Sequence, residues 1–272
     1  NETDATNVSG KIGLQWDASD DSMVYATFSE GYKGPAFNVF YNMGINDTLP
    51  IGEETSDALE IGWKYTGPNL FANIAVFQTD IENFQANNFD TSGGTTITRL
   101  TNAGDVSTQG VELDFVWQPT ENFQLSGGFA KIDAEIDRFN CPIGVAPGAC
   151  TSRRGLDVPF SPDLKWSLNA NLVVPFENMD VIFNGSFVHT DDQVSTLPGN
   201  NGSENPAARL PEYEIFNASV ALSFQEDKYR LTFIGKNLTD ESYATTFSGD
   251  GFRYQVPRDA ERYFGVNLRA NF

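Results

Sequence analysis

A formal net charge of −20 over 272 residues leaves this chain without the basic footprint that nucleic-acid binding requires, so no nucleic-acid partner is expected. Mean hydropathy is −0.33, and no run approaches the roughly 20 apolar residues of a membrane-spanning helix, so the sequence predicts none. The 22 Phe, 9 Tyr and 24 Gly residues suit a β-barrel with aromatic girdles and small side chains that face the lumen.

Apolar and polar residues alternate along eleven segments, and a period of two indicates strands with two different faces. In the first segment, Ile12 and Leu14 fall on one face and Lys11 on the other. Segments of about ten residues are long enough to cross a bilayer at a tilt. The predicted strands are, in chain order, 8–18, 22–31, 55–66, 69–82, 105–118, 121–134, 164–176, 179–190, 212–224, 227–237 and 259–272.

The connections between these strands alternate in length. Short turns follow every odd-numbered strand but the last, and the long connections are 32–54, 83–104, 135–163, 191–211 and 238–258. Barrels of the outer membrane have short turns at one end and long loops at the other, whereas a sandwich with Greek-key links need not sort its loops. The sequence therefore predicts an all-β fold, an antiparallel transmembrane β-barrel with about eleven strands, whose long loops face outward.

Eleven strands cannot form a standard bacterial barrel, because single-chain barrels have even strand numbers. An unpaired strand edge in lipid is also strongly unfavourable. Either the count is off by one, or residues 1–272 are half of a larger barrel, and the polar opening at Asn1 favours a chain that begins inside a longer protein.

The two cysteines, Cys141 and Cys150, flank a segment rich in Pro and Gly. Such a pair suits a disulfide that pins a loop in an oxidising compartment. A metal site would need more ligands than two thiolates and the distant His189, so neither a metal nor a cofactor is expected.

No acid–base or nucleophile constellation is visible, so the chain is not expected to be an enzyme. Substrate-binding candidates lie instead in three long loops. Paired arginines suit carboxylate or phosphate groups of a ligand, although ion pairing within the loop is an alternative. Aromatic loop residues can stack on a ligand or lie at the membrane interface. The candidates are Phe37, Tyr41, Arg153, Arg154, Phe252 and Arg253.

Several segments resemble TonB-dependent outer-membrane receptors, in the order in which that family carries them. They run from about residue 22 to the end. The segments are Tyr25-Ala-Thr-Phe-Ser-Glu-Gly-Tyr-Lys-Gly-Pro-Ala-Phe-Asn38, Glu53-Glu-Thr-Ser-Asp-Ala-Leu-Glu-Ile-Gly62, Phe77-Gln-Thr-Asp-Ile, Asn102-Ala-Gly-Asp-Val, Gln109-Gly-Val-Glu-Leu, Gly235-Lys-Asn-Leu-Thr-Asp-Glu-Ser-Tyr243 and Tyr263-Phe-Gly-Val-Asn-Leu-Arg-Ala-Asn-Phe272.

This resemblance implies a 22-stranded barrel around an N-terminal plug, of which residues 1–272 would be the C-terminal portion. The plug, the TonB-contacting box and the first half of the barrel would then be absent from this sequence. The resemblance also implies uptake of a scarce small molecule, typically a ferric siderophore or another iron chelate, powered by TonB with ExbB and ExbD. The location implied is the outer membrane, in contact with lipid and lipopolysaccharide.

The closing strand carries a further implication of the resemblance. In outer-membrane proteins, a terminal aromatic preceded by alternating apolar residues is the signal that the barrel-assembly machinery reads. The residues in those positions are Phe264, Val266, Leu268, Ala270 and Phe272.

Two other functions remain open from the residues alone. A smaller complete barrel would be a passive channel or porin, with an even strand count and no plug. An outer-membrane enzyme or adhesin would use the barrel as a platform and would need convergent reactive side chains near the outer rim.

Overall fold

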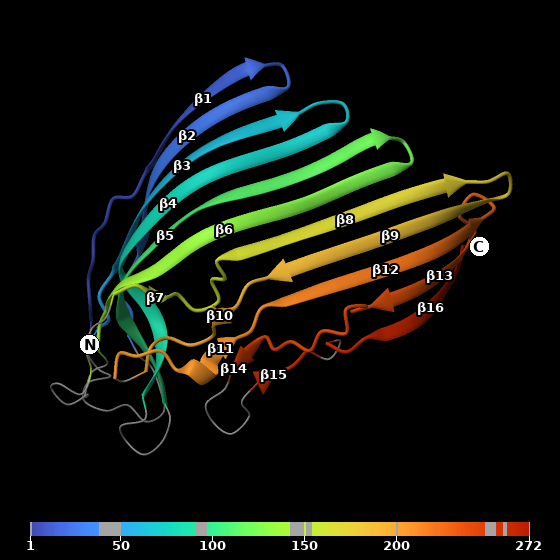
Figure 1. Cartoon of the computed structure of the whole chain (residues 1–272). Helices are drawn as coiled ribbons and strands as arrows, with labels where there is room; N and C mark the ends of the chain where they lie inside the picture. Colours follow the sequence, from blue (N-terminus) through green and yellow to red (C-terminus); the bar gives the residue numbers. More distant parts are fainter. Residues whose placement is uncertain are drawn as a thin grey trace.

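One curved antiparallel sheet contains all the long strands that the computed structural model describes (Figure 1). The structure describes residues 2–37, 50–90, 97–141, 150, 154–199, 201–247, 254–257 and 260–271. Eleven strands follow one another in this sheet, each paired with the next along the chain: β1 (Lys11–Ser19), β2 (Ser22–Lys33), β3 (Glu54–Thr66), β4 (Leu70–Asp90), β5 (Ile97–Thr120), β6 (Phe123–Phe139), β8 (Leu164–Pro175), β9 (Met179–Thr190), β12 (Tyr213–Phe224), β13 (Tyr229–Lys236) and β16 (Tyr263–Ala270).

The remaining elements are short and lie at the end of the sheet where the long connections gather (Figure 1). They are β7 (Leu156–Asp157), which pairs with β6; β10 (Gln193–Val194) with β11 (Arg209–Leu210); β14 (Thr246–Phe247) with β15 (Tyr254–Gln255); and the 3-10 helix η2 (Pro206–Ala208). All the short turns lie at the opposite end of the sheet. The predicted number, order and sorted connections of the main strands are therefore confirmed. Among the described residues, no helix is long and apolar enough to cross a membrane.

The predicted long loop at 83–104 is wrong, because β4 and β5 continue through most of it. Pairing breaks where Asn83 adopts a left-handed φ of 55° and resumes with Phe84 opposite Gly104. After a second shift in register it continues from Gln85 opposite Asn102 to Asp90 opposite Ile97. A bulge interrupts a ladder without ending it, and a change of alternation at the bulge hides the continuation in the sequence. The hairpin thus extends well beyond the length needed to cross a bilayer.

The predicted final strand begins too early, because the described residues from Ala260 to Arg262 precede β16. Ala260 is buried, and its carbonyl accepts a hydrogen bond from the Asn237 side chain at 2.6 Å. The alternation that placed Ala260 on a strand face therefore extends into a loop that is anchored by other contacts.

The register of the strands gives the sheet two different faces. The apolar face holds rows such as Ile61, Val76 and Val111, which are opposite one another on β3, β4 and β5. Asn169 and Ser186, paired across β8 and β9, lie on the polar face. Apolar side chains are most exposed on the two edge strands, where Leu14 is 77% and Phe264 74% exposed. This is the distribution that lipid on one side and water on the other require.

Aromatic residues gather on the apolar face at the end with the short turns. Trp63 stacks on Tyr65 with ring centroids 5.8 Å apart, and Trp117 meets Phe123 edge-on at 6.3 Å. Trp16 joins this belt from β1. Rings with an apolar body and a polar tip are favoured where a bilayer meets water, so this belt marks one interfacial level of the sheet.

The bulge requires glycine at position 104. Gly104 has a φ of 142°, and a Cβ there would lie 1.6 Å from the Arg138 carbonyl oxygen. We expect Gly104→Ala to destabilise the protein by about 1–3 kcal/mol, the usual range for a strained backbone position. Urea unfolding in detergent, followed by tryptophan fluorescence, measures this.

The matched control is Gly128→Ala on β6, because a Cβ there would have no neighbour closer than 3.8 Å. Equal loss of stability in both variants would contradict the assignment of strain to Gly104.

Candidate functional site

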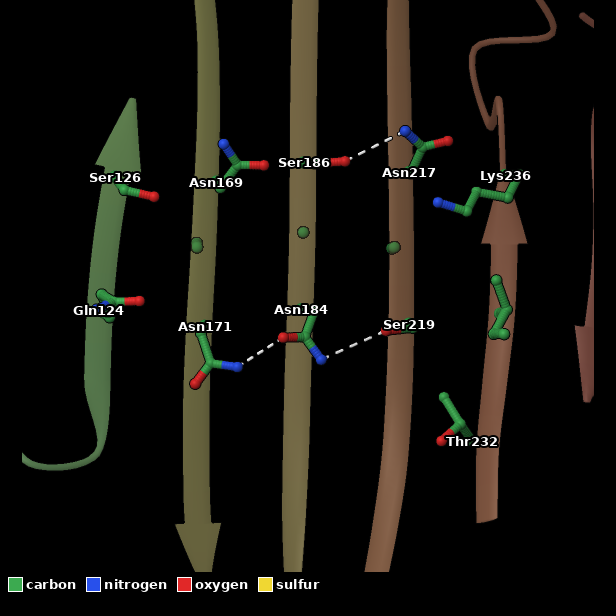
Figure 2. A pocket seen from close by; sticks show the side chains of 14 residues that line it. Gln124, Ser126, Asn169, Asn171, Asn184, Ser186, Asn217, Ser219, Thr232 and Lys236 are labelled. Carbon is green, nitrogen blue, oxygen red and sulfur yellow. Dashed lines mark hydrogen bonds between the residues drawn. The ribbon is translucent and has the colours of Figure 1, made fainter. Parts of the chain in front are cut away.

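The polar face of β6, β8, β9, β12 and β13 forms a recess of about 470 Å³ (Figure 2). Its rows of amides and hydroxyls follow from the strand register, because Asn171, Asn184 and Ser219 are opposite one another on three neighbouring strands. Asn169, Ser186 and Asn217 form the next row. The recess is therefore a wall of hydrogen-bonding groups with little formal charge.

Hydrogen bonds run across the strands within this wall (Figure 2). Asn171 Nδ2 donates to Asn184 Oδ1 at 2.6 Å, and Asn184 Nδ2 donates to Ser219 Oγ at 3.4 Å. Asn217 Nδ2 donates to Ser186 Oγ at 3.2 Å in the neighbouring row. An amide has two donor hydrogens and two acceptor positions, so each of these side chains keeps capacity for a polar solute or another polypeptide segment.

Arg209 joins several of the connections at the end of the sheet where the long connections gather. Its guanidinium donates to Asp157 Oδ2 at 2.5 Å, to Asp192 Oδ2 at 2.5 Å and to Glu204 Oε2 at 3.3 Å. The hydrogen bonds to Asp192 and Asp157 raise the pKa of Arg209 further above its ordinary value, so it stays charged at every working pH. One cation thereby joins β7, β11 and two intervening loop segments.

A small apolar core lies beneath these connections. Val106, Ile136 and Phe139 are buried, and Cys150 and Leu156 pack against them. The disulfide between Cys141 and Cys150, with Cα atoms 5.9 Å apart, fastens the connection between β6 and β7 at this core. Apolar burial and a covalent link together hold one end of this outer connection on the barrel wall.

Asn237 organises the connection that follows β13. It is 2% exposed, and its backbone has a left-handed φ of 47°, which Asn tolerates better than most residues. The Nδ2 group donates to the carbonyls of Glu241 at 2.7 Å and Ala260 at 2.6 Å, and Oδ1 accepts from the Glu241 amide at 3.0 Å. A single amide thus closes both ends of the loop between β13 and β16.

Two of the six predicted substrate-binding residues can be placed. Phe37 is half-buried, directly after the isolated bridge between Ala36 and Ile51, and Arg154 is exposed between β6 and β7. No hydrogen bond, ion pair or ring contact joins these two described residues. Tyr41, Arg153, Phe252 and Arg253 lie outside the described residues, as does Phe272 of the predicted assembly signal.

The other predicted assembly-signal residues lie on β16. Phe264, Val266 and Leu268 are exposed on the apolar face of this edge strand, and Ala270 is its last residue.

His189 lies at the end of β9 that adjoins the long connections. Its ring stacks on Trp166 and lies between two carboxylates, with Nε2 2.9 Å from Asp191 Oδ1 and Nδ1 3.2 Å from Glu214 Oε1. Within the described ranges, no group of three His, Cys, Asp or Glu side chains could hold a metal ion.

The sequence did not identify Arg209 or Asn237 as organising residues. The signal for Asn237 lay in the Gly235–Tyr243 segment, where Asn at the end of a strand precedes Thr and Asp, residue types that favour turns. Arg209 gave no such signal, because its three partners come from connections whose paths the alternation does not define.

Comparison with known proteins agrees with this architecture. The family model described as TonB dependent receptor-like, beta-barrel matches residues 1–238. The pesticin receptor of Yersinia pestis is 26% identical over 272 residues, a match that covers 97% of this chain and 36% of the receptor. The chain therefore spans about a third of the length of the curated relatives that it matches.

Solved structures share the fold. The ferric yersiniabactin uptake receptor FyuA from Yersinia pestis gives a TM-score of 0.76 at 22% identity, with 97% of this chain and 37% of FyuA covered. The closed form of the ferric-catecholate import receptor Fiu from E. coli K12 gives a TM-score of 0.68 at 18% identity, with 96% and 34% covered.

Removal of the Arg209 charge should release the outer connections. In Arg209→Gln, three carboxylates remain without their shared cation. Because a charge-assisted hydrogen bond contributes about 1.5–3 kcal/mol, we expect proteolysis of 191–211 to accelerate about tenfold or more. Limited proteolysis of the intact protein, analysed by mass spectrometry, measures the rate, and Arg154→Gln, at an exposed position before β7, is the control. A rate equal to that of the control would refute the role of Arg209.

Asn237 allows backbone and side-chain effects to be separated. Asn237→Ala removes the side-chain contacts and adds left-handed strain, whereas Asn237→Gly removes the contacts alone. We expect both to destabilise the loop between β13 and β16, Ala by about 2–4 kcal/mol and Gly by less, because two carbonyls lose their donor. Hydrogen exchange at the Glu241 amide reports the loss. Wild-type protection in the Gly variant would show that only the backbone conformation matters.

Proposed function

Because this chain belongs to the family of TonB-dependent receptor β-barrels, we propose that it forms the C-terminal portion of an outer-membrane transporter for an iron chelate of the siderophore class. The family is located in the outer membrane of Gram-negative bacteria, as the resemblance predicted. Its members are receptors and transporters rather than enzymes. The family match over residues 1–238 is the observation that carries the proposal.

The names of the relatives support the substrate class. FyuA is a ferric yersiniabactin uptake receptor, Fiu imports ferric catecholates and FecA transports ferric citrate. A copper transporter, OprC, has the same fold at a TM-score of 0.68. Iron chelates therefore predominate among these neighbours, and we propose one as the substrate, held by the outer connections that carry Phe37, Tyr41, Arg153, Arg154, Phe252 and Arg253.

The partners of the whole receptor follow from the same proposal. TonB-dependent receptors interact with TonB, and we propose that ExbB and ExbD energise this contact through a region outside this chain. We also propose that the barrel-assembly machinery reads the β16 residues Phe264, Val266, Leu268 and Ala270 with Phe272. The apolar face then contacts lipid and lipopolysaccharide.

The passive-channel alternative requires a closed barrel. The sheet of described strands runs from β1 to β16 without pairing these two edge strands to each other. These unpaired edges support the proposal that residues 1–272 form one section of a larger barrel wall.

Uptake measured with and without TonB distinguishes energised transport from a channel. The full-length receptor is expressed in a strain that lacks its own iron-chelate receptors, and radioactive iron is supplied as ferric yersiniabactin, ferric citrate or a ferric catecholate. We expect saturable uptake of at least one complex, lost when TonB is deleted. Uptake that persists without TonB and rises linearly with concentration would establish the passive channel instead.

A further inference from the structure

Charge is unevenly distributed over the polar face of the sheet. Strand register and alternation place Glu60, Glu112 and Asp114 of β3 and β5 on this face, with Lys64 as their neighbour. On β8, β13 and β16 the same face instead carries cations, namely Lys165, Arg230, Lys236 and Arg269. The polar face therefore carries mainly carboxylates on β3 and β5 and mainly cations from β8 to β16, where Asp180 of β9 is its one carboxylate on these described strands.

Two of these cations, Arg230 and Arg269, already share one carboxylate. Asp227, in the turn between β12 and β13, accepts from Arg230 Nε at 2.6 Å and also pairs with Arg269. Lys236, at the other end of β13, makes no hydrogen bond or ion pair with the residues that the structure describes. It is exposed, and the residues that line the recess around it include no carboxylate.

Hydrogen-bond donors lie on the β12 side of Lys236. Gly235 pairs with Ala218, so Lys236 and Asn217 occupy the next position along their strands, and the lysine side chain extends toward Asn217 (Figure 2). Asn217 Oδ1 accepts from the Asn237 amide at 2.9 Å, and one Nδ2 hydrogen goes to Ser186 Oγ. The second Nδ2 hydrogen and the Ser186 hydroxyl hydrogen remain available as donors.

We propose that Lys236, Asn217 and Ser186 form a binding site for a carboxylate group on the polar face. A carboxylate accepts several hydrogen bonds, and charge-assisted bonds from an ammonium are about twice as strong as neutral ones. The carboxylate belongs either to a transported chelate or to an acidic side chain of another segment of the receptor. This inference rests on the proposed function, because the polar face must line the path of the substrate.

Citrate is a suitable probe because it carries carboxylate groups and no aromatic group, so its binding tests recognition of the carboxylate alone. Lysines of the full-length receptor in nanodiscs are reductively methylated with isotope-labelled methyl groups, and Lys236→Gln assigns the Lys236 signal. At constant ionic strength we expect citrate to shift this signal saturably, with an affinity on the order of 1 mM. Lys131, exposed on β6 and paired in register with the apolar-face residue Val111, should not respond.

The source of the carboxylate is read from a second measurement. Calorimetric citrate binding should weaken about tenfold or more in Lys236→Gln, but not in Lys131→Gln, if the site takes a solute. If an acidic side chain of the receptor already occupies it, citrate leaves the Lys236 signal unmoved, and Lys236→Gln instead lowers the melting temperature relative to Lys131→Gln. An unmoved signal together with equal melting temperatures overturns the proposal.

Measuring iron uptake by the same receptor tests the proposed function independently of the carboxylate site. Citrate binding without TonB-dependent uptake of any chelate would count against the transporter and leave the site standing. Uptake without either signature at Lys236 would remove the site and leave the transporter.

Discussion

Backbone hydrogen bonding between neighbouring strands decides at once which peptide groups are satisfied and which side chains share a face. In lipid an unpaired N–H or C=O group costs several kcal/mol, so a spanning chain must pair every strand. The ladder from β1 to β16 achieves this for all but its two edges. The register also determines the face on which each side chain lies, because a shift of one residue would move every apolar side chain of a strand to the opposite face.

The ladder also explains why polar side chains matter most where strands end. Beyond β6, β9 and β13 the backbone loses its regular partners, and side chains replace them. Asn237 supplies donors and an acceptor to the loop after β13, and Arg209 draws together carboxylates from connections far apart in sequence. Asn237 directly follows β13, so the loop that it holds inherits part of the rigidity of the main sheet. Arg209 lies on β11 in a separate two-stranded sheet and connects it to β7, which pairs with β6.

The sequence allowed prediction of the parts that depend on period two. The eleven main strands, their order and the alternation of short and long connections all follow from this period. In β3, for example, it places Ile61 and Trp63 on one face and Lys64 on the other. The extension of β4 and β5 could not be predicted, because the bulge at Asn83 changes which residues share a face. The start of β16 was misjudged because Ala260 continues the pattern by chance while its carbonyl serves Asn237.

The candidate site was harder to predict, because its members come together through register and not through spacing. Asn169, Asn171 and Ser219 were recognisable as polar-face residues of their own strands. Their proximity depends on the register between β8, β9 and β12, and the lengths of the turns alone do not determine that register. The loop candidates were chosen by residue type, and a loop has no periodicity from which to infer neighbours.

The wall and the outer connections share one residue, and this joins two otherwise separate parts of the molecule. Asn217 donates to Ser186 within the recess and accepts from the backbone of Asn237, whose side chain fixes the loop between β13 and β16. A carboxylate bound beside Lys236 would accept the second Nδ2 hydrogen of Asn217, so it would bind the same amide that supports the Asn237 turn. Because the bonds to Ser186 and from the Asn237 amide fix the orientation of the Asn217 side chain, its second Nδ2 hydrogen has a fixed direction in the recess before any group binds.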